Sequence, residues 1–161
     1  MNKNENLDLS YFMGEVAVEN VEYPAPKRFV DKNGNRINLV FRILSIEEQR
    51  EIRKHHRKRT IVKDEKTGRP YINPNGTVCM DETFDSDNNM AELLVESLVY
   101  PDLSDKELMK HFNCFDVLKM PAKVFPTNDE LLYVYDAFNR VHGFTDNEES
   151  EKESDVEKAK N

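Results

Sequence analysis

Six basic side chains surround two adjacent histidines between residues 50 and 60, in the stretch REIRKHHRKRT. Residues of these types could contact nucleic-acid phosphates, hold a metal ion or form the solvated end of a helix. The charges are ordered, because Glu47, Glu48 and Glu51 come before most of the basic residues. Acids at the start and bases at the end of a helix complement its dipole, so the pattern favours a solvated helix end.

A nucleic-acid site or a metal site fits the rest of the chain less well. The formal net charge is −8, whereas a nucleic-acid-binding domain is expected to be basic, and no aromatic residue is interleaved with the bases. On a helix His55 and His56 would point about 100° apart, which suits two ligands of one metal poorly. We therefore expect no nucleic-acid contact and no metal site. A basic patch that meets an acidic protein partner stays open, with Arg53, Arg57 and Arg59 as candidate residues.

Motifs of catalysis are absent from the sequence. It contains no GxSxG, P-loop, GxGxxG or HExxH pattern, and no pair of carboxylates stands out as an acid–base dyad. We expect a protein that is not an enzyme, with no catalytic residue, no cofactor and no small-molecule substrate.

The composition predicts one domain with flexible ends. The chain has 161 residues, of which 34% are charged and only 38% hydrophobic. From Thr145 onward there are seven acidic and three basic residues, and Val156 is the single large aliphatic one. Such a segment buries too little surface to offset its ordering entropy. We expect a partly flexible segment at 1–26, a domain at 27–144 and a disordered acidic tail at 145–161.

The sequence also favours a cytoplasmic protein. No apolar run approaches the roughly 20 residues that a membrane span needs, and the first ten residues, MNKNENLDLS, lack the apolar core of a signal peptide. Cys79 and Cys114 stand alone, so a disulfide framework is not expected and a reducing compartment fits.

A β-hairpin is predicted near the start of the domain. Asn33-Gly34 is typical of a type I′ turn, which needs positive φ at both central positions. Phe29 precedes this turn, and the apolar residues after it alternate strictly: Ile37, Leu39, Phe41 and Ile43. Alternation of this kind predicts strands with one apolar face.

Three capping boxes predict helix starts. Ser45 with Glu48 opens a helix that we expect to reach residue 60, Ser104 with Glu107 opens a second, and Thr127 with Glu130 opens the last. Leu103 and Leu108 are placed to staple the second start. The last helix has an apolar stripe and ends at Gly143. Tyr133 lies off this stripe, and we expect it to be exposed as a further partner-binding candidate.

Two more helices end at prolines. One covers residues 85–100, with Leu98 and Val99 facing inward, before Pro101, and a shorter one covers about 115–120 before Pro121. Residues 61–84 carry two turn signals and are either a flexible β-like excursion or a long loop. The predicted fold class is mainly α with a small N-terminal β-hairpin (α+β): a compact helical domain followed by a disordered acidic tail.

The order of these elements resembles the phage tail assembly chaperones of tailed phages and prophages of Gram-positive hosts. Three stretches carry the resemblance: RFVDKNGNRINLVFRILSIEEQREIRKHHRKRT, AELLVESLVYPDLSDKELMKHFNCFDVLKM, and a last helix that ends in FNRVHGF. Coverage runs from about Lys27 to Phe144. The chain departs from the family pattern at MPAKVFPTNDE, where a small-residue turn is usual, and in the length of residues 61–84.

The resemblance implies a non-enzymatic assembly factor. Its partners would be the tape measure protein, which it would hold soluble, and the tail tube protein, which polymerises around the tape measure. It would act in the host bacterial cytoplasm and be absent from the mature virion. Two alternatives remain: a structural tail or head–tail joining protein that stays in the particle, and a small prophage regulator that binds nucleic acid.

Overall fold

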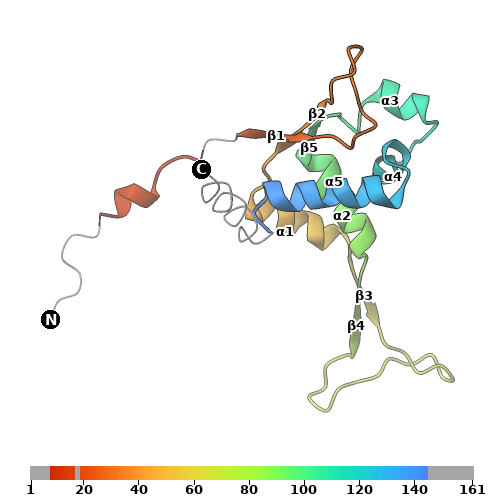
Figure 1. The fold of residues 1–161 in the computed structure, drawn as a ribbon. Helices are drawn as coiled ribbons and strands as arrows, with labels where there is room; N and C mark the ends of the chain where they lie inside the picture. The colour runs from red at the N-terminus through yellow and green to blue at the C-terminus, as the bar shows by residue number, and fades with distance from the viewer. Residues whose placement is uncertain (1–7, 17–18, 145–161) are drawn as a thin grey trace, which may run out of the picture.

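The computed structural model describes residues 8–16 and 19–144. The predicted disordered tail at 145–161 lies outside these residues. In chain order the elements are η1 (Leu9–Phe12), β1 (Asn20–Pro24), β2 (Asn38–Arg42), α1 (Ile46–His55), β3 (Arg57–Ile61), β4 (Met80–Phe84), α2 (Ser86–Ser97), β5 (Leu98–Tyr100), α3 (Lys106–His111), η2 (Val117–Lys119), α4 (Met120–Val124) and α5 (Asn128–Val141). The α+β fold class is confirmed (Figure 1).

A small antiparallel sheet has the strand order β1-β2-β5. The predicted hairpin exists, but its first strand is β1 and not the stretch around Phe29. Residues near Phe29 belong instead to a long connection that is closed by a single bridge between Val30 and Arg36. The apolar alternation holds at Leu39 and Phe41 and then breaks, because Leu44 is buried and Ile43 is exposed.

The turn at Asn33-Gly34 is not of type I′. Only Gly34 has positive φ, at 81°, and its N–H donates to the carbonyl of Asp31. The Asp31 carboxylate accepts the N–H groups of Asn33 and Asn35 at 2.8 and 2.9 Å. This is a type I turn followed by a glycine in the left-handed region. The hydrogen bonds to the Asp31 side chain stabilise it relative to the two-residue type I′ turn.

The first helix starts where the sequence predicts and stops earlier. Ser45 and Glu48 form the complete capping box, but α1 ends at His55, and residues 57–61 form β3. The prediction that Leu98 and Val99 extend the next helix is also wrong. Residues 98–100 pair with β2 as β5, because Pro101 disfavours helical geometry in the residue before it and the sheet edge offers partners.

The later helices differ from the sequence-based prediction in three details. Asp105, not Ser104, caps α3, and its carboxylate accepts the N–H of Leu108 at 2.9 Å. Pro121 does not stop a helix; it lies in the first turn of α4, where its missing N–H costs nothing. Thr127 caps α5 as expected, but the Glu130 side chain pairs with Arg28 instead of reaching back. Gly143 has the predicted left-handed conformation, with φ of 75°.

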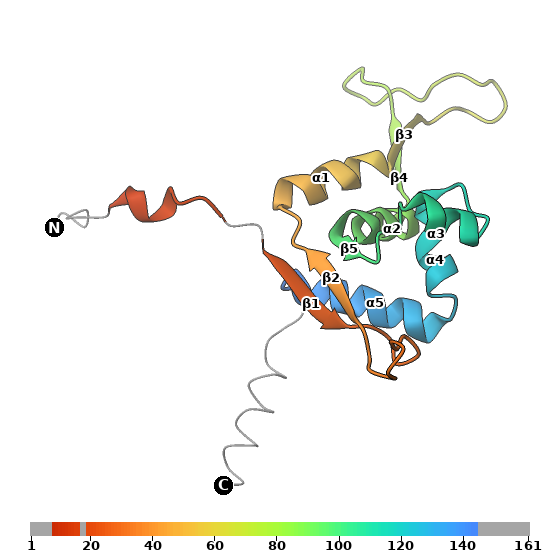
Figure 2. The same ribbon diagram turned by 90° about the horizontal axis from the view of Figure 1, so that it is seen from above.

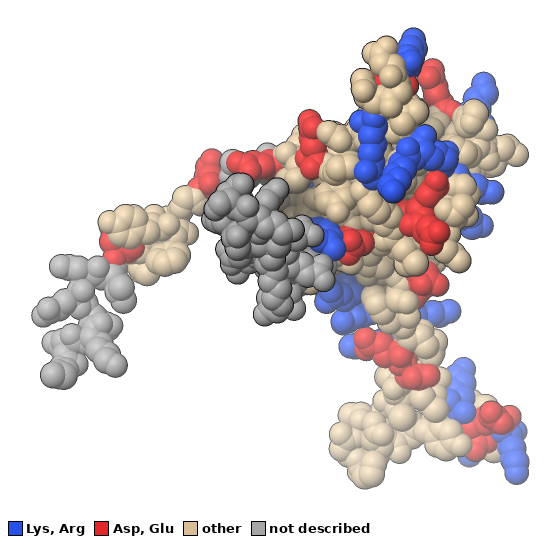
Figure 3. All heavy atoms as spheres, in the orientation of Figure 1, with Lys and Arg blue, Asp and Glu red and all other residues tan. Residues whose placement is uncertain are grey.

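Residues 57–84 form a long two-stranded ribbon that projects from the helical body (Figures 1 and 2). Strands β3 and β4 pair in register from Arg57 with Phe84 to Ile61 with Met80. Beyond them, single bridges join Lys63 to Pro70 and Ile72 to Val78. Of the two readings that the sequence left open, the β-like excursion is therefore correct. Lys and Arg side chains gather where this ribbon leaves the body (Figure 3).

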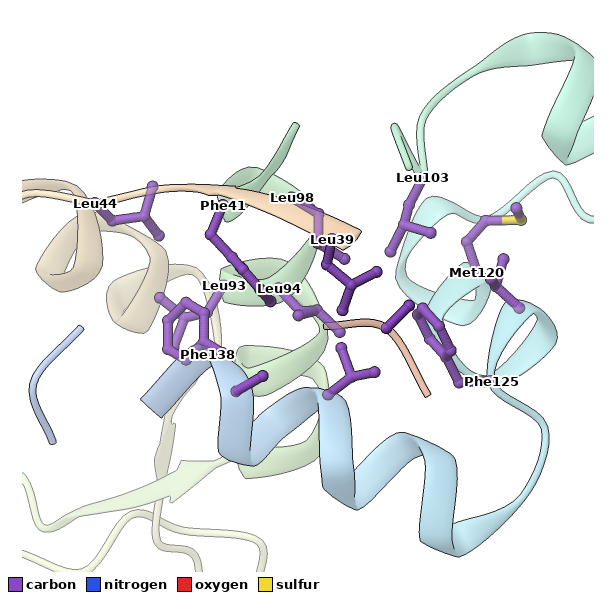
Figure 4. Packing of buried hydrophobic residues seen from close by; sticks show 14 of the residues in the cluster. Leu39, Phe41, Leu44, Leu93, Leu94, Leu98, Leu103, Met120, Phe125 and Phe138 are labelled. Carbon is purple, nitrogen blue, oxygen red and sulfur yellow. The ribbon is translucent and has the colours of Figure 1, made fainter. Parts of the chain in front are cut away.

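The core lies between the sheet and the helices α2, α4 and α5 (Figure 4). Phe41 of β2, Leu94 of α2 and Phe138 of α5 are almost fully buried within it. Leu103, in the turn after β5, is also fully buried, while Leu108 packs against the core from a half-buried position. The helix stripe predicted for α5 is confirmed, because Val134 and Phe138 face this core.

Candidate partner-binding site

The basic stretch at residues 50–60 spans the end of helix α1 and the start of strand β3. Arg53 lies in the last turn of α1, where its charge is favourable beside the helix carboxyl end. The N–H of His56 closes that end by donating to the carbonyls of Arg53 and Lys54. Arg57 and Arg59 follow on β3, so the three arginines are exposed around the base of the ribbon.

A single carboxylate from α2 holds the two histidines. Glu92 Oε1 lies 2.8 Å from His55 Nδ1, and Glu92 Oε2 contacts His56 Nε2. Because α1 ends between the two residues, their rings converge on Glu92 instead of diverging as they would on a continuous helix. The carboxylate and the His56 side chain are both largely shielded, with exposed fractions of 19% and 10%. This contact anchors the root of the ribbon to the body, and sequence reasoning did not find it.

One face of the ribbon carries both charge and apolar side chains. Alternation along the strands places Arg57, Arg59 and Ile61 of β3 on the same face as Met80, Glu82 and Phe84 of β4. Glu82 lies 3.2 Å from Arg59 Nε and 3.6 Å from Arg57 Nε. One carboxylate therefore meets two guanidinium groups, and this face keeps a positive balance.

Apolar side chains stay in solvent along the whole ribbon. The exposed ones are Ile61, Tyr71, Ile72, Val78, Met80 and Phe84. A two-stranded ribbon with no second layer is marginally stable by itself. Exposed apolar side chains that lie among charged ones are typical of protein-interaction surfaces. We call this surface, together with Arg53, the ribbon site.

Local side-chain caps order the two bends of the ribbon. The Asp64 carboxylate accepts the N–H groups of Lys66 and Thr67 at 2.9 and 2.8 Å, and these hydrogen bonds keep the pKa of Asp64 below its usual range. At the second bend the Asn75 side chain accepts the N–H of Thr77 at 3.1 Å. The ribbon is thus a defined shape, held by its own hydrogen bonds.

Tyr133 lies elsewhere and makes structural contacts. Its hydroxyl donates to the carbonyl of Pro24 at 2.9 Å and accepts from Arg36 at 3.0 Å, while its ring packs on Tyr23. Burial raises the pKa of the Tyr133 phenol. The structure therefore does not bring Tyr133 together with Arg53, Arg57 and Arg59. Tyr133 instead joins α5 to β1 and to the connection between β1 and β2.

The described part of the chain contains neither a cluster of metal-binding side chains nor a helix that could span a membrane. Within residues 8–16 and 19–144, no three His, Cys, Asp or Glu side chains come together as a metal site would require. In the same ranges, every helix is too short or too polar to cross a bilayer.

Comparison with known proteins identifies the family. Residues 9–160 match the family of phage XkdN-like tail assembly chaperone proteins. Two similar proteins come from Bacillus subtilis (strain 168): the phage-like element PBSX protein XkdN is 30% identical over 154 residues, covering 94% of this chain and 95% of XkdN. The uncharacterized protein YqbN is 31% identical over 155 residues, with the same two coverages. The chain belongs to the phage tail assembly chaperone family.

The fold agrees with this assignment. The crystal structure of YqbN superposes with a TM-score of 0.63 at 24% identity, covering 89% of this chain and all of that one. The family match over residues 9–160 and the similarity to XkdN confirm the family resemblance inferred from the order of sequence elements.

Proposed function

We propose that this protein binds the tape measure protein of its own phage or prophage and keeps it soluble until tail tube subunits assemble around it. The complex would form in the host cytoplasm, with no chemical turnover, and the protein would be absent from the finished virion. The family assignment supports the assembly role. The choice of contact surface rests on the ribbon site, which has exposed apolar side chains and several arginines at its root.

The chemistry of the ribbon site fits a helical partner with an acidic edge. On one face of the ribbon Ile61 and Met80 form an exposed apolar pair, and Phe84 lies nearer the root, beyond the Arg59–Glu82 pair. A helix laid along this face could bury apolar side chains of its own against both ends. Arg57 and Arg59 lie among these apolar side chains, and Arg53 lies in the last turn of α1 just before the ribbon. Carboxylates on the helix would pair with these arginines, set its register and speed encounter. A long helical protein that has not yet been enclosed by its tube presents such faces before assembly.

Co-expression tests the proposed function. The tape measure protein from the same genome should move from the pellet to the soluble fraction when this chain is present, and the two should co-purify. If the tape measure protein is equally soluble alone, or never co-purifies, the proposed function is wrong. Purified virions give a second test, because a structural tail protein would be found in them and an assembly factor would not.

Charge variants test the contact surface separately. Replacing Arg53, Arg57 and Arg59 by Gln should weaken the complex and make the residual binding less sensitive to salt. Gln is preferable to Glu because a carboxylate on β3 would face Glu82 across the ribbon and destabilise the strand pair. The matched control replaces three exposed lysines outside the ribbon by Gln: Lys32, Lys106 and Lys110. Equal binding by the two triple variants would exclude the arginines as a contact while leaving the function intact.

A further inference from the structure

A short N-terminal arm, residues 8–16, presents some of the most exposed apolar side chains in the described residues. Phe12 and Tyr11 are 88% and 83% exposed, and Leu9, Met13 and Val16 are also in solvent. The arm is not shapeless, because residues 9–12 form the 3₁₀ turn η1 and the Asp8 carboxylate accepts the N–H of Ser10 at 2.9 Å. An ordered turn that displays large apolar side chains is a ready-made docking element.

An apolar pocket on the body matches this element in character. It has a volume of about 360 Å³ and lies between the β1–β2 connection, the end of β5, α3 and the link from α4 to α5. Its apolar lining includes Phe29, Ile37, Tyr100, Leu108, Phe112 and Phe125. A pocket of this size lies within the range of ligand sites. Aromatic and aliphatic walls suit an aromatic anchor such as Phe12.

The charges of the arm and the pocket are complementary. Residues 8–16 contain Asp8 and Glu15 and no Lys or Arg. The pocket lining has three basic side chains, Arg28, His111 and Lys123, and no Asp or Glu. Arg28 is already paired with Glu130, with Nε and Oε1 2.6 Å apart. Lys123 is exposed and makes no salt bridge with any described residue, so it is the cation available to the acids of an arm.

The arm leaves the body at the end of β1 that is remote from the pocket. Ala25 lines the pocket, and β1 ends next to it at Pro24 and leads back away from the pocket to Asn20. At the rise of a β-strand, Pro24 and Asn20 are roughly 13 Å apart. Beyond β1 the arm extends away from the body (Figures 1 and 2). We propose that the arm of one copy docks in this pocket of a second copy of the chain, and that reciprocal docking builds a symmetric dimer.

Symmetry makes a small contact effective. In a two-fold dimer each copy gives one arm and receives one, so the same pair of surfaces is used twice. Once the first arm has docked, the second docks within the same particle and adds to the stability of the dimer. This assembly is independent of the proposed chaperone role, because it uses neither the ribbon nor the arginines at its base.

Sedimentation equilibrium on the full chain tests the dimer. The mass should rise with concentration from 18.9 kDa to twice that value, and the dissociation constant should increase with salt. Phe12→Ser should weaken association by at least ~10-fold, because it removes the anchor. Lys123→Glu should weaken it by about 10-fold through repulsion of the arm's acids. The control Lys106→Glu changes an exposed lysine outside the pocket lining and should alter association less than about twofold.

A mixing experiment distinguishes exchange between copies from docking within one copy. The Phe12→Ser chain keeps its pocket and the Lys123→Glu chain keeps its arm, so the mixed dimer has one intact arm–pocket contact and should form more readily than the dimer of the weaker variant. Three results would overturn the proposal: a monomer at millimolar concentration, a dimer that both substitutions leave unchanged, or a monomer in which Phe12 is protected from solvent. Since Phe12 and Lys123 are exposed in one copy, neither change removes a buried contact of the fold.

Discussion

The backbone N–H of Leu44 donates to Nε2 of His142 at 2.9 Å, although 98 residues separate them. The other ring nitrogen of His142 lies 2.9 Å from the carbonyl of Phe138, which can only accept. Nδ1 must therefore carry the hydrogen, and Nε2 must be unprotonated to receive the Leu44 N–H. The neutral ring joins the end of α5 to the segment between β2 and α1.

This arrangement predicts an acid-sensitive fold. Burial, reinforced by the positive charge of Arg42, lowers the pKa of His142 from its ordinary value, although the bond to Phe138 acts the other way. The unfolded chain then binds the proton first, so stability is full above about pH 6.5 and falls as the pH drops towards the folded-state pKa. Urea unfolding between pH 7 and 5 should show this loss. His142→Gln should flatten the slope, while the exposed His111→Gln should not; identical slopes in all three proteins would contradict the assignment.

Leu103 should be one of the most sensitive positions in the core. It is fully buried in the turn between β5 and α3, so Leu103→Ala should destabilise the fold by about 2–5 kcal/mol through lost contacts and a residual cavity. Leu132 of α5 is 64% exposed and is the matched control, and Leu132→Ala should cost under ~0.5 kcal/mol. Chemical denaturation of the two variants compares them; similar small losses would mean that the turn does not pack as described.

Asp105 should stabilise α3 more than its neighbour Ser104 does. The Asp105 carboxylate caps the N–H of Leu108, whereas the Ser104 hydroxyl donates to Asp102 at 2.6 Å. Asp105→Ala should therefore cost about 1 kcal/mol. Denaturation midpoints of Asp105→Ala and Ser104→Ala give the comparison. A larger loss for Ser104→Ala would restore the capping box that the sequence pattern suggested.

The ribbon should be dispensable for folding. Strands β3 and β4 are exposed along their whole length, and Arg57 pairs directly with Phe84 at the root. A two-residue Asn-Gly turn could therefore join these two residues in place of 58–83. We expect the shortened chain to keep cooperative thermal unfolding with a midpoint close to that of the full chain. A loss of cooperativity would show that the ribbon supports the core.

Features set by neighbours in sequence were predictable. The capping box at Ser45 and the left-handed Gly143 each depend on residues within one helical turn, and both were found from the sequence. Pro101 also disfavours helical geometry in the residue before it, so the extended conformation of Tyr100 in β5 has a local cause as well.

Features set by distant partners were not predictable in the same way. No glycine or proline marks the end of α1, and β3 forms because Arg57–Ile61 pairs with Met80–Phe84. Likewise Glu92 meets His55 and His56 only once α2 packs beside α1. The arginines of the ribbon site were found by composition, but its apolar side chains were not, because their exposure depends on a ribbon that no second layer covers.

Binding of the ribbonless chain to the tape measure protein tests the central claim most directly. The variant with 58–83 replaced by Asn-Gly would first be shown to fold, and then co-expressed with the tape measure protein beside the full chain and the Lys32, Lys106 and Lys110 control. We predict that the full chain and the control hold the tape measure protein in the soluble fraction and co-purify with it, while the folded ribbonless chain does neither. Equal recovery of the tape measure protein by the ribbonless chain would contradict the assignment of the ribbon as the partner-binding site.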